Sequence, residues 1–166
     1  MIDEAKSIWA GLEFRKAMLL RNVEPLSEGQ MRWIPAPGRV SIAWQFWHIA
    51  EVEENWVGGL VLGEALRFPF GVQVREAGDD EYPDKAALID YLHEVRALSR
   101  RRLEATTGAD LERMVADVDY GAITVREVWA GVVTSFAWHA GQVALTAKLL
   151  PHSPVTEMKF GYWKQS

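Results

Sequence analysis

The sequence predicts an all-α fold, a four-helix bundle that forms one domain over residues 1–166. Two observations lead to this prediction. Four long segments carry apolar residues at steps of three and four, and the connections between them are rich in proline and glycine. Alternating patterns typical of strands are scarce. With 49% hydrophobic residues, a chain of 166 residues can bury a substantial core.

The first helix is expected over residues 3–22, where Ile8, Leu12 and Leu19 recur at helical spacing. Prolines in the following connection, residues 23–39, exclude another long helix there.

The second helix is expected over residues 41–62. Ser41 is a suitable N-cap, because its hydroxyl can accept a hydrogen bond from a free amide of the first turn. The next connection, residues 63–83, is long for a compact domain. It is expected either to cross the bundle or to form part of a functional site.

The third helix is expected over residues 84–105, with Asp84 as its cap after Pro83. The connection that follows, residues 106–123, predicts a short helix and then an extended turn around Gly121.

The fourth helix is expected over residues 124–150. Thr124 and Glu127 have the spacing of a capping box, and Pro151 ends the helix. The tail, residues 152–166, keeps several aromatic side chains and is expected to dock on the bundle.

Charge and cysteine content exclude several classes of site. The net charge of −5 disfavours a nucleic-acid surface, and the absence of cysteine excludes disulfides and thiolate ligands. Arg96 and Arg100 to Arg102 form a basic cluster, which is interpreted as the solvated C-terminal end of a helix.

The N-terminus carries acidic residues where a signal peptide would carry positive charge. No stretch has the roughly 20 uninterrupted apolar residues that a membrane span needs. We therefore expect a soluble, cytoplasmic protein without a membrane partner, whose partner is a small-molecule substrate.

Two histidines lie near the middle of long helices among bulky apolar residues, His48 in the second and His139 in the fourth. Inward side chains of facing helices can converge, and two neutral imidazoles could hold a divalent ion. Glu51 lies one turn after His48 and could be an auxiliary ligand or base. Gln142 has the same relation to His139 and is a candidate for orienting it from outside the ligand shell.

The alternative interpretation is structural. A single helical histidine in an aromatic-rich core is more often a hydrogen-bonded packing residue than a ligand. His93 and His152 are not expected to bind a metal, and the helical spacing of Trp44, Trp47 and Trp56 favours core packing over ligand stacking.

Two segments carry a resemblance to a known family. PAPGRVSIAWQFWHIAEVEENWVGGLVLG, which contains His48, resembles the first motif of the DinB-like family of four-helix metalloenzymes. TVREVWAGVVTSFAWHAGQ, which contains His139, resembles the second motif. The resemblance covers nearly the whole chain.

The resemblance implies an up-down-down-up bundle, which would explain the long second connection. It also implies a divalent ion, nickel or zinc, held by three histidines at one end of the bundle cavity. Relatives include thiol-dependent transferases and an isomerase, and many form homodimers.

The sequence departs from the family pattern at Ser135, which occupies the position of the middle histidine ligand. Two imidazoles are fewer than the usual three protein ligands, and Glu51 is the candidate replacement. One hypothesis is therefore a metal-dependent thiol transferase or hydrolase with His48 and His139 as ligands. The other is a metal-free protein whose degenerate site binds a small molecule or a partner. A nucleophilic role for Ser135 is disfavoured, because no orienting acid is evident nearby.

Overall fold

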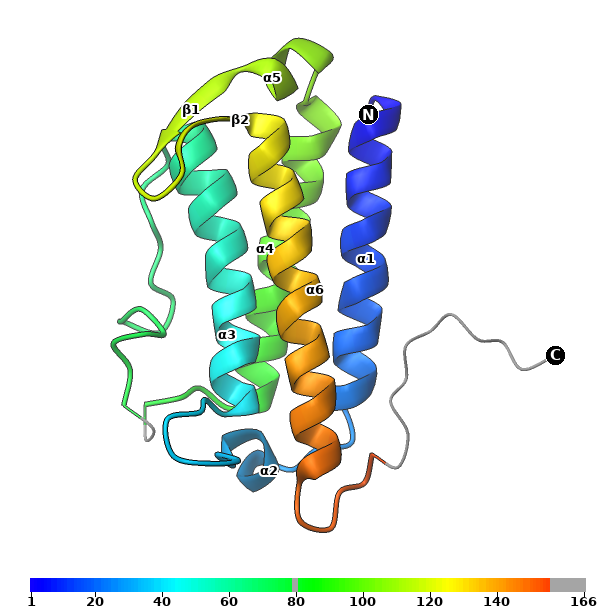
Figure 1. The fold of residues 1–166 in the computed structure, drawn as a ribbon, viewed down its shortest axis with the longest axis vertical. Helices are drawn as coiled ribbons and strands as arrows, with labels where there is room; N and C mark the ends of the chain where they lie inside the picture. The colour runs from blue at the N-terminus through cyan, green and yellow to red at the C-terminus, as the bar shows by residue number, and fades with distance from the viewer. Residues whose placement is uncertain (79–80, 156–166) are drawn as a thin grey trace, which may run out of the picture.

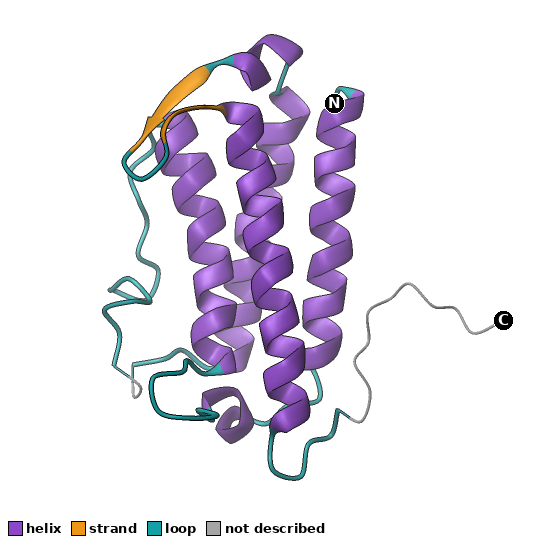
Figure 2. Ribbon diagram, in the orientation of Figure 1, coloured by secondary structure: helices purple, strands orange, loops and turns teal. Residues whose placement is uncertain are grey.

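The computed structural model describes residues 1–78 and 81–155, and within them the chain is mainly helical, as the sequence predicts (Figures 1 and 2). The elements, in chain order, are α1 (Asp3–Val23), α2 (Glu28–Arg32), α3 (Ile42–Glu53), a π-helix (Glu54–Val61), α4 (Lys85–Ala105), α5 (Gly108–Glu112), β1 (Met114–Asp117), β2 (Gly121–Thr124) and α6 (Val125–Leu149). Aromatic residues of the tail, which we expected to dock, lie outside the described residues.

Three of the long helices, α3, α4 and α6, begin at side chains that satisfy free backbone amides. The Ser41 hydroxyl accepts from the Trp44 amide at 3.1 Å, and the Asp84 carboxylate accepts from the Ala87 amide at 2.8 Å. Thr124 and the residue three positions on form the predicted capping box at the start of α6.

Two long helices start at each end of the molecule. α1 and α6 start at the end that carries α5 and the short hairpin, whereas α3 and α4 start at the end that carries α2 (Figure 1). The segment between the π-helix and α4 must therefore return along the bundle, and Figure 1 shows it running beside α3. β1 and β2 pair antiparallel, with Met114 opposite Thr124, and this hairpin includes the extended turn expected around Gly121. Within the described residues, no helix is long and apolar enough to cross a membrane.

The second predicted helix is not a uniform α-helix. Its α-helical part ends at Glu53, and residues Glu54–Val61 continue as a π-helix. A π-helix widens the turn, with hydrogen bonds to the fifth rather than the fourth residue, and is frequent at functional sites. The sequence gives no direct signal for it beyond Gly58 and Gly59, which lie in this turn.

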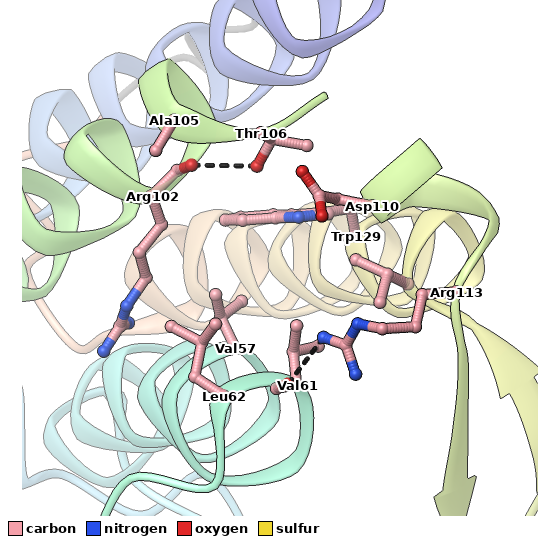
Figure 3. A pocket seen from close by; sticks show the side chains of 10 residues that line it. Val57, Val61, Leu62, Arg102, Ala105, Thr106, Asp110, Arg113 and Trp129 are labelled. Atoms are coloured by element: carbon pink, nitrogen blue, oxygen red, sulfur yellow. Dashed lines mark hydrogen bonds between the residues drawn. The ribbon is translucent and has the colours of Figure 1, made fainter. Parts of the chain in front are cut away.

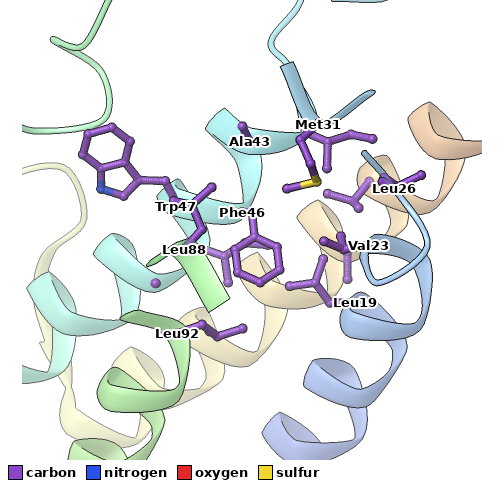
Figure 4. Close-up of a cluster of buried hydrophobic side chains, with 14 of the residues drawn as sticks. Leu19, Val23, Leu26, Met31, Ala43, Phe46, Trp47, Leu88 and Leu92 are labelled. Atoms are coloured by element: carbon purple, nitrogen blue, oxygen red, sulfur yellow. The ribbon is translucent and has the colours of Figure 1, made fainter. Parts of the chain in front are cut away.

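Buried apolar side chains form two clusters, one toward each end of the bundle. The larger cluster joins α1, α2, α3, α4 and α6, and the close-up in Figure 4 labels nine of its members: Leu19, Val23, Leu26, Met31, Ala43, Phe46, Trp47, Leu88 and Leu92. The second cluster includes Val57 and Val61 of the π-helix, Leu103 of α4, and Trp129 of α6.

A buried ion pair lies in the interior. Arg96 of α4 is 2% exposed, and its Nη2 lies 3.0 Å from Oε2 of Glu53, whose side chain is 0% exposed. The interpretation of the basic cluster as a solvated helix end is therefore wrong for Arg96. Its positive charge is buried because it faces a carboxylate of α3 and the ring of Phe136, whose centroid is 4.4 Å from the guanidinium carbon.

Gly131 of α6 allows the π-helix to approach closely. A Cβ atom at this position would lie 2.4 Å from Cζ3 of Trp56, a distance that requires the ring or the helix to move. Gly131 is thus required by packing, although its backbone is ordinary α-helix.

We predict that Gly131→Ala lowers the free energy of unfolding by about 1–3 kcal/mol, because it overpacks the contact with Trp56. Gly141→Ala on the same helix is the control, since no heavy atom lies within 4 Å of its added Cβ. The control should raise stability by roughly 0.5–1 kcal/mol through helix propensity. Urea denaturation of both variants checks this, and equal effects would contradict the packing argument.

Candidate functional site

The structure brings His48 of α3 and His139 of α6 into direct contact. Their ring centroids are 4.8 Å apart and the ring planes are inclined at 74°, so that one ring meets the other edge-on. His48 also has a stacked neighbour, Trp44, one turn earlier, with ring centroids 4.6 Å apart and ring planes inclined at 18°. The two histidines that the sequence analysis identified as candidate ligands are therefore neighbours in the bundle.

Both histidines are partly buried, and this favours their neutral forms. Burial lowers the pKa of His48 from its ordinary value of 6.5 to about 4, and the neighbouring His139 lowers it further in the same direction. Burial also lowers the pKa of His139, while a side-chain hydrogen bond with Gln142 opposes that change. At neutral pH the pair is uncharged, which is the form that ligates metals.

His139 has a ring nitrogen with no hydrogen-bond partner. Nδ1 is buried, and no described residue donates to it or accepts from it. A buried polar atom in this state is destabilising unless water, an ion or a ligand satisfies it. The nitrogen therefore marks where His139 can bind something.

Glu51, the candidate auxiliary ligand, is hydrogen-bonded to the backbone of the returning segment. Its Oε2 accepts a hydrogen bond from the Val74 amide at 3.0 Å, which ties the returning segment to α3. Burial raises the pKa of Glu51, and the Val74 hydrogen bond opposes that rise. Within residues 1–78 and 81–155, no group of three histidine, cysteine, aspartate or glutamate side chains could hold a metal ion.

A cavity of about 430 Å³ adjoins His48. The returning segment forms one wall of this cavity, and α3 with the first π-helical turn forms the other. The long connection between the π-helix and α4 is therefore part of the cavity wall. The side chains that line it are Trp44, His48, Glu51, Val52, Asn55, Leu66, Gln73, Val74 and Arg75.

The remaining predicted residues lie on α6. Ser135 is half-buried and lies one helical turn before His139. Gln142 borders a separate hollow between α6 and the segment before α3, which it shares with Gln45 and Arg39. Asn55, two turns after His48, lines the same cavity, as its helical spacing indicates. Sequence reasoning missed Arg75, which comes from the returning segment and gives no local signal.

Comparison with known proteins identifies the family. The sequence profile of the DinB superfamily matches residues 12–144, which is most of the chain. The chain belongs to the DinB superfamily. The superfamily match includes both His48 and His139, so the resemblance seen in the two motifs is confirmed at the level of the family.

A solved structure has the same fold as this DinB-superfamily chain. It is the crystal structure of the conserved protein of locus from Enterococcus faecalis, with a TM-score of 0.74 and 15% identity. The alignment covers 90% of this chain and 98% of that one. At this identity the likeness concerns the fold alone. No curated protein matches the chain.

The DinB superfamily is generally associated with metals, and the residues here fit such an ion in part. The donor set offers two neutral imidazoles in contact, one of which has an unpaired buried nitrogen. These groups suit nickel or zinc. The set does not include a third protein ligand among the described residues, since Glu51 is bonded elsewhere.

The pKa of His48 is lower in the folded protein than in the unfolded chain. The contribution of the neutral His48 ring to the free energy of unfolding is therefore fully present above pH 6.5. This contribution is lost as the pH falls toward 4, since the unfolded chain takes up the proton first. For this part-exposed ring we expect a loss of roughly 2 kcal/mol after allowance for solvent screening.

Chemical denaturation of chelator-treated protein between pH 7 and 4 checks this prediction. His48→Gln should have a shallower pH dependence than the wild type, whereas His93→Gln, on an exposed face of α4, should reproduce the wild-type curve. Parallel curves for wild type and His48→Gln would contradict a neutral, buried His48. Subtracting the stability of each variant from that of the wild type at the same pH removes the contribution of the buried carboxylates, which all three proteins share.

Proposed function

We propose that His48 and His139 hold a divalent metal ion, nickel or zinc, in a DinB-like four-helix bundle of up-down-down-up order. The observation that carries the proposal is the contact between the two imidazoles at 4.8 Å, made by residues of α3 and α6 that are far apart in the chain. The unpaired Nδ1 of His139 supports it, because this lone buried nitrogen lacks any other partner among the described residues.

The activity that we propose is a metal-dependent thiol transfer or hydrolysis. An ion at this position would supply Lewis acidity and lower the pKa of a bound thiol or water. The chain's own residues have distinct roles: Trp44 holds the His48 ring by stacking, Glu51 anchors the wall of the cavity through Val74, and Arg75 offers a cation to the substrate. Two protein ligands leave the other coordination positions to the substrate or solvent.

A homodimer is part of this proposal. α6 exposes three large apolar side chains, Trp138, Leu145 and Leu149, at 67%, 52% and 59%. Their spacing places them along one face of the helix. Exposed apolar side chains that share a face are typical of protein contact surfaces. A cytoplasmic location remains a prediction.

A second function is favoured by a different observation. Because no three-ligand group exists among the described residues, the same cavity could serve a metal-free protein that binds a small polar molecule. Here His48, which lines the cavity, would contact the ligand directly, and Ser135 would mark the loss of the metal.

We predict that the untagged wild-type protein binds nickel or zinc measurably but weakly, and that His139→Ala abolishes this binding. Ser135→His should raise metal affinity by at least about tenfold, because it places a third imidazole one turn before His139. Thr134→His is the matched control, since it adds a histidine at an exposed neighbouring position. Elemental analysis and calorimetric titration with each metal check these expectations.

Metal uptake by the wild type that disappears in His139→Ala supports the metal-dependent function. If the wild type binds no metal while Ser135→His does, the bundle geometry is retained and the metal-free function is correct. If neither protein binds metal and Ser135→His folds normally, the assignment of the His48–His139 pair as a metal position is wrong.

A further inference from the structure

Another hollow, of about 280 Å³, lies toward the end of the bundle that carries α5. It shares no residue with the cavity beside His48. Its walls come from the π-helix, the C-terminal end of α4, α5 with the residue after it, and the first turns of α6 (Figure 3). The π-helix thus faces, across one space, the stretch of chain that runs from the end of α4 to the start of α6.

The floor of this hollow is apolar. Trp129 is buried at its back, and Val57 and Leu62 of the π-helical turn face it from the opposite side (Figure 3). The hollow therefore opens into the second apolar cluster, to which Val57 and Trp129 belong. An aromatic or branched aliphatic body is what such a floor would accept.

Two arginines border the hollow from different sides. Arg113, after α5, donates from Nη2 to the carbonyl oxygen of Val61 at 2.7 Å, which is a neutral acceptor. Arg102 of α4 pairs with Glu64 through Nη2, and its Nη1 is buried without a hydrogen-bond partner among the described residues. Guanidinium groups bind carboxylates through two parallel hydrogen bonds, and Arg113 has donors left for such a contact.

One carboxylate also borders the hollow, and one of its two oxygens caps α5. Asp110 Oδ2 accepts from the Thr107 hydroxyl at 2.7 Å and from the Thr107 amide at 2.8 Å. These bonds hold the pKa of Asp110 below its usual range, and the charge of Arg113 acts in the same direction. Asp110 therefore serves the N-terminus of α5, and its neighbour Arg113 remains the available charge.

We propose that this hollow is a binding site for a small carboxylate with an aromatic or branched apolar body. The apolar part would lie against Trp129 and Val57, and the carboxylate would pair with Arg113, with Arg102 at the opposite wall. The site is independent of the His48–His139 pair and needs no metal. A cation would face two guanidinium groups.

Phenylacetate, its neutral analogue 2-phenylethanol and its cationic analogue 2-phenylethylamine are suitable probes. We expect phenylacetate to bind the full chain with a dissociation constant in the millimolar range, and the two analogues to bind at least about fivefold more weakly. Titration followed through the tryptophan indole N–H signals in ¹H–¹⁵N spectra measures this, with Trp129→Phe used to assign the Trp129 signal.

Arg113→Gln should weaken phenylacetate binding by about tenfold, because it removes the charge while keeping a donor for Val61. Arg101→Gln is the matched control on α4, since Arg101 is exposed and does not border the hollow. Leu62→Trp should abolish binding by filling the space, since Leu62 is half-exposed and tolerates a larger ring. His48→Ala should bind phenylacetate like the wild type.

Binding that shifts the Trp129 signal, requires Arg113 and is blocked by Leu62→Trp supports the proposal. The proposal is overturned if wild-type protein shows no saturable binding of phenylacetate, if the neutral analogue binds equally well, or if Arg113→Gln binds like Arg101→Gln. Loss of binding in His48→Ala would place the ligand in the other cavity and would also overturn it.

Discussion

The buried ion pair between Arg96 and Glu53 ties the helices of this bundle together. It joins α4 to α3 directly, and the guanidinium also lies over the ring of Phe136, which belongs to α6. Glu13 of α1 is close enough to oppose, through its charge, the effect of burial on the pKa of Arg96. Four helices therefore meet at one side chain. Because isolated buried charges are very unfavourable, any sliding of these helices would leave Arg96 or Glu53 uncompensated.

This constraint accounts for two other features of the structure. The chain changes from α-helix to π-helix immediately after Glu53, so the ion pair lies at the start of the segment in which Trp56 packs on Gly131. The ion pair also accompanies the division of the apolar interior into two clusters. One cluster supports the end where His48 lies, and the other supports the hollow lined by Trp129. The two candidate sites of this DinB-superfamily protein are thus built on separate parts of the core.

The helices could be predicted because their signals are local. The capping box at Thr124 and the stop at Pro151 depend on neighbouring residues, and the contact between His48 and His139 follows once their helices face each other. Arg96 could not be predicted, because a basic residue on a helix is solvated unless a distant carboxylate faces it. Glu51 was predicted as a ligand candidate from its spacing alone, whereas its hydrogen bond to Val74 depends on the path of the returning segment.

A double-mutant cycle on Arg96 and Glu53, measured as the free energy of unfolding by urea, tests the central claim most directly. Arg96→Met and Glu53→Leu should each cost about 3–5 kcal/mol, because each leaves one buried charge alone. The double variant should cost less than either single variant, since it removes both charges from the core. Single variants that cost under about 1 kcal/mol, or additive effects in the double variant, would show that the pair does not hold the helices together.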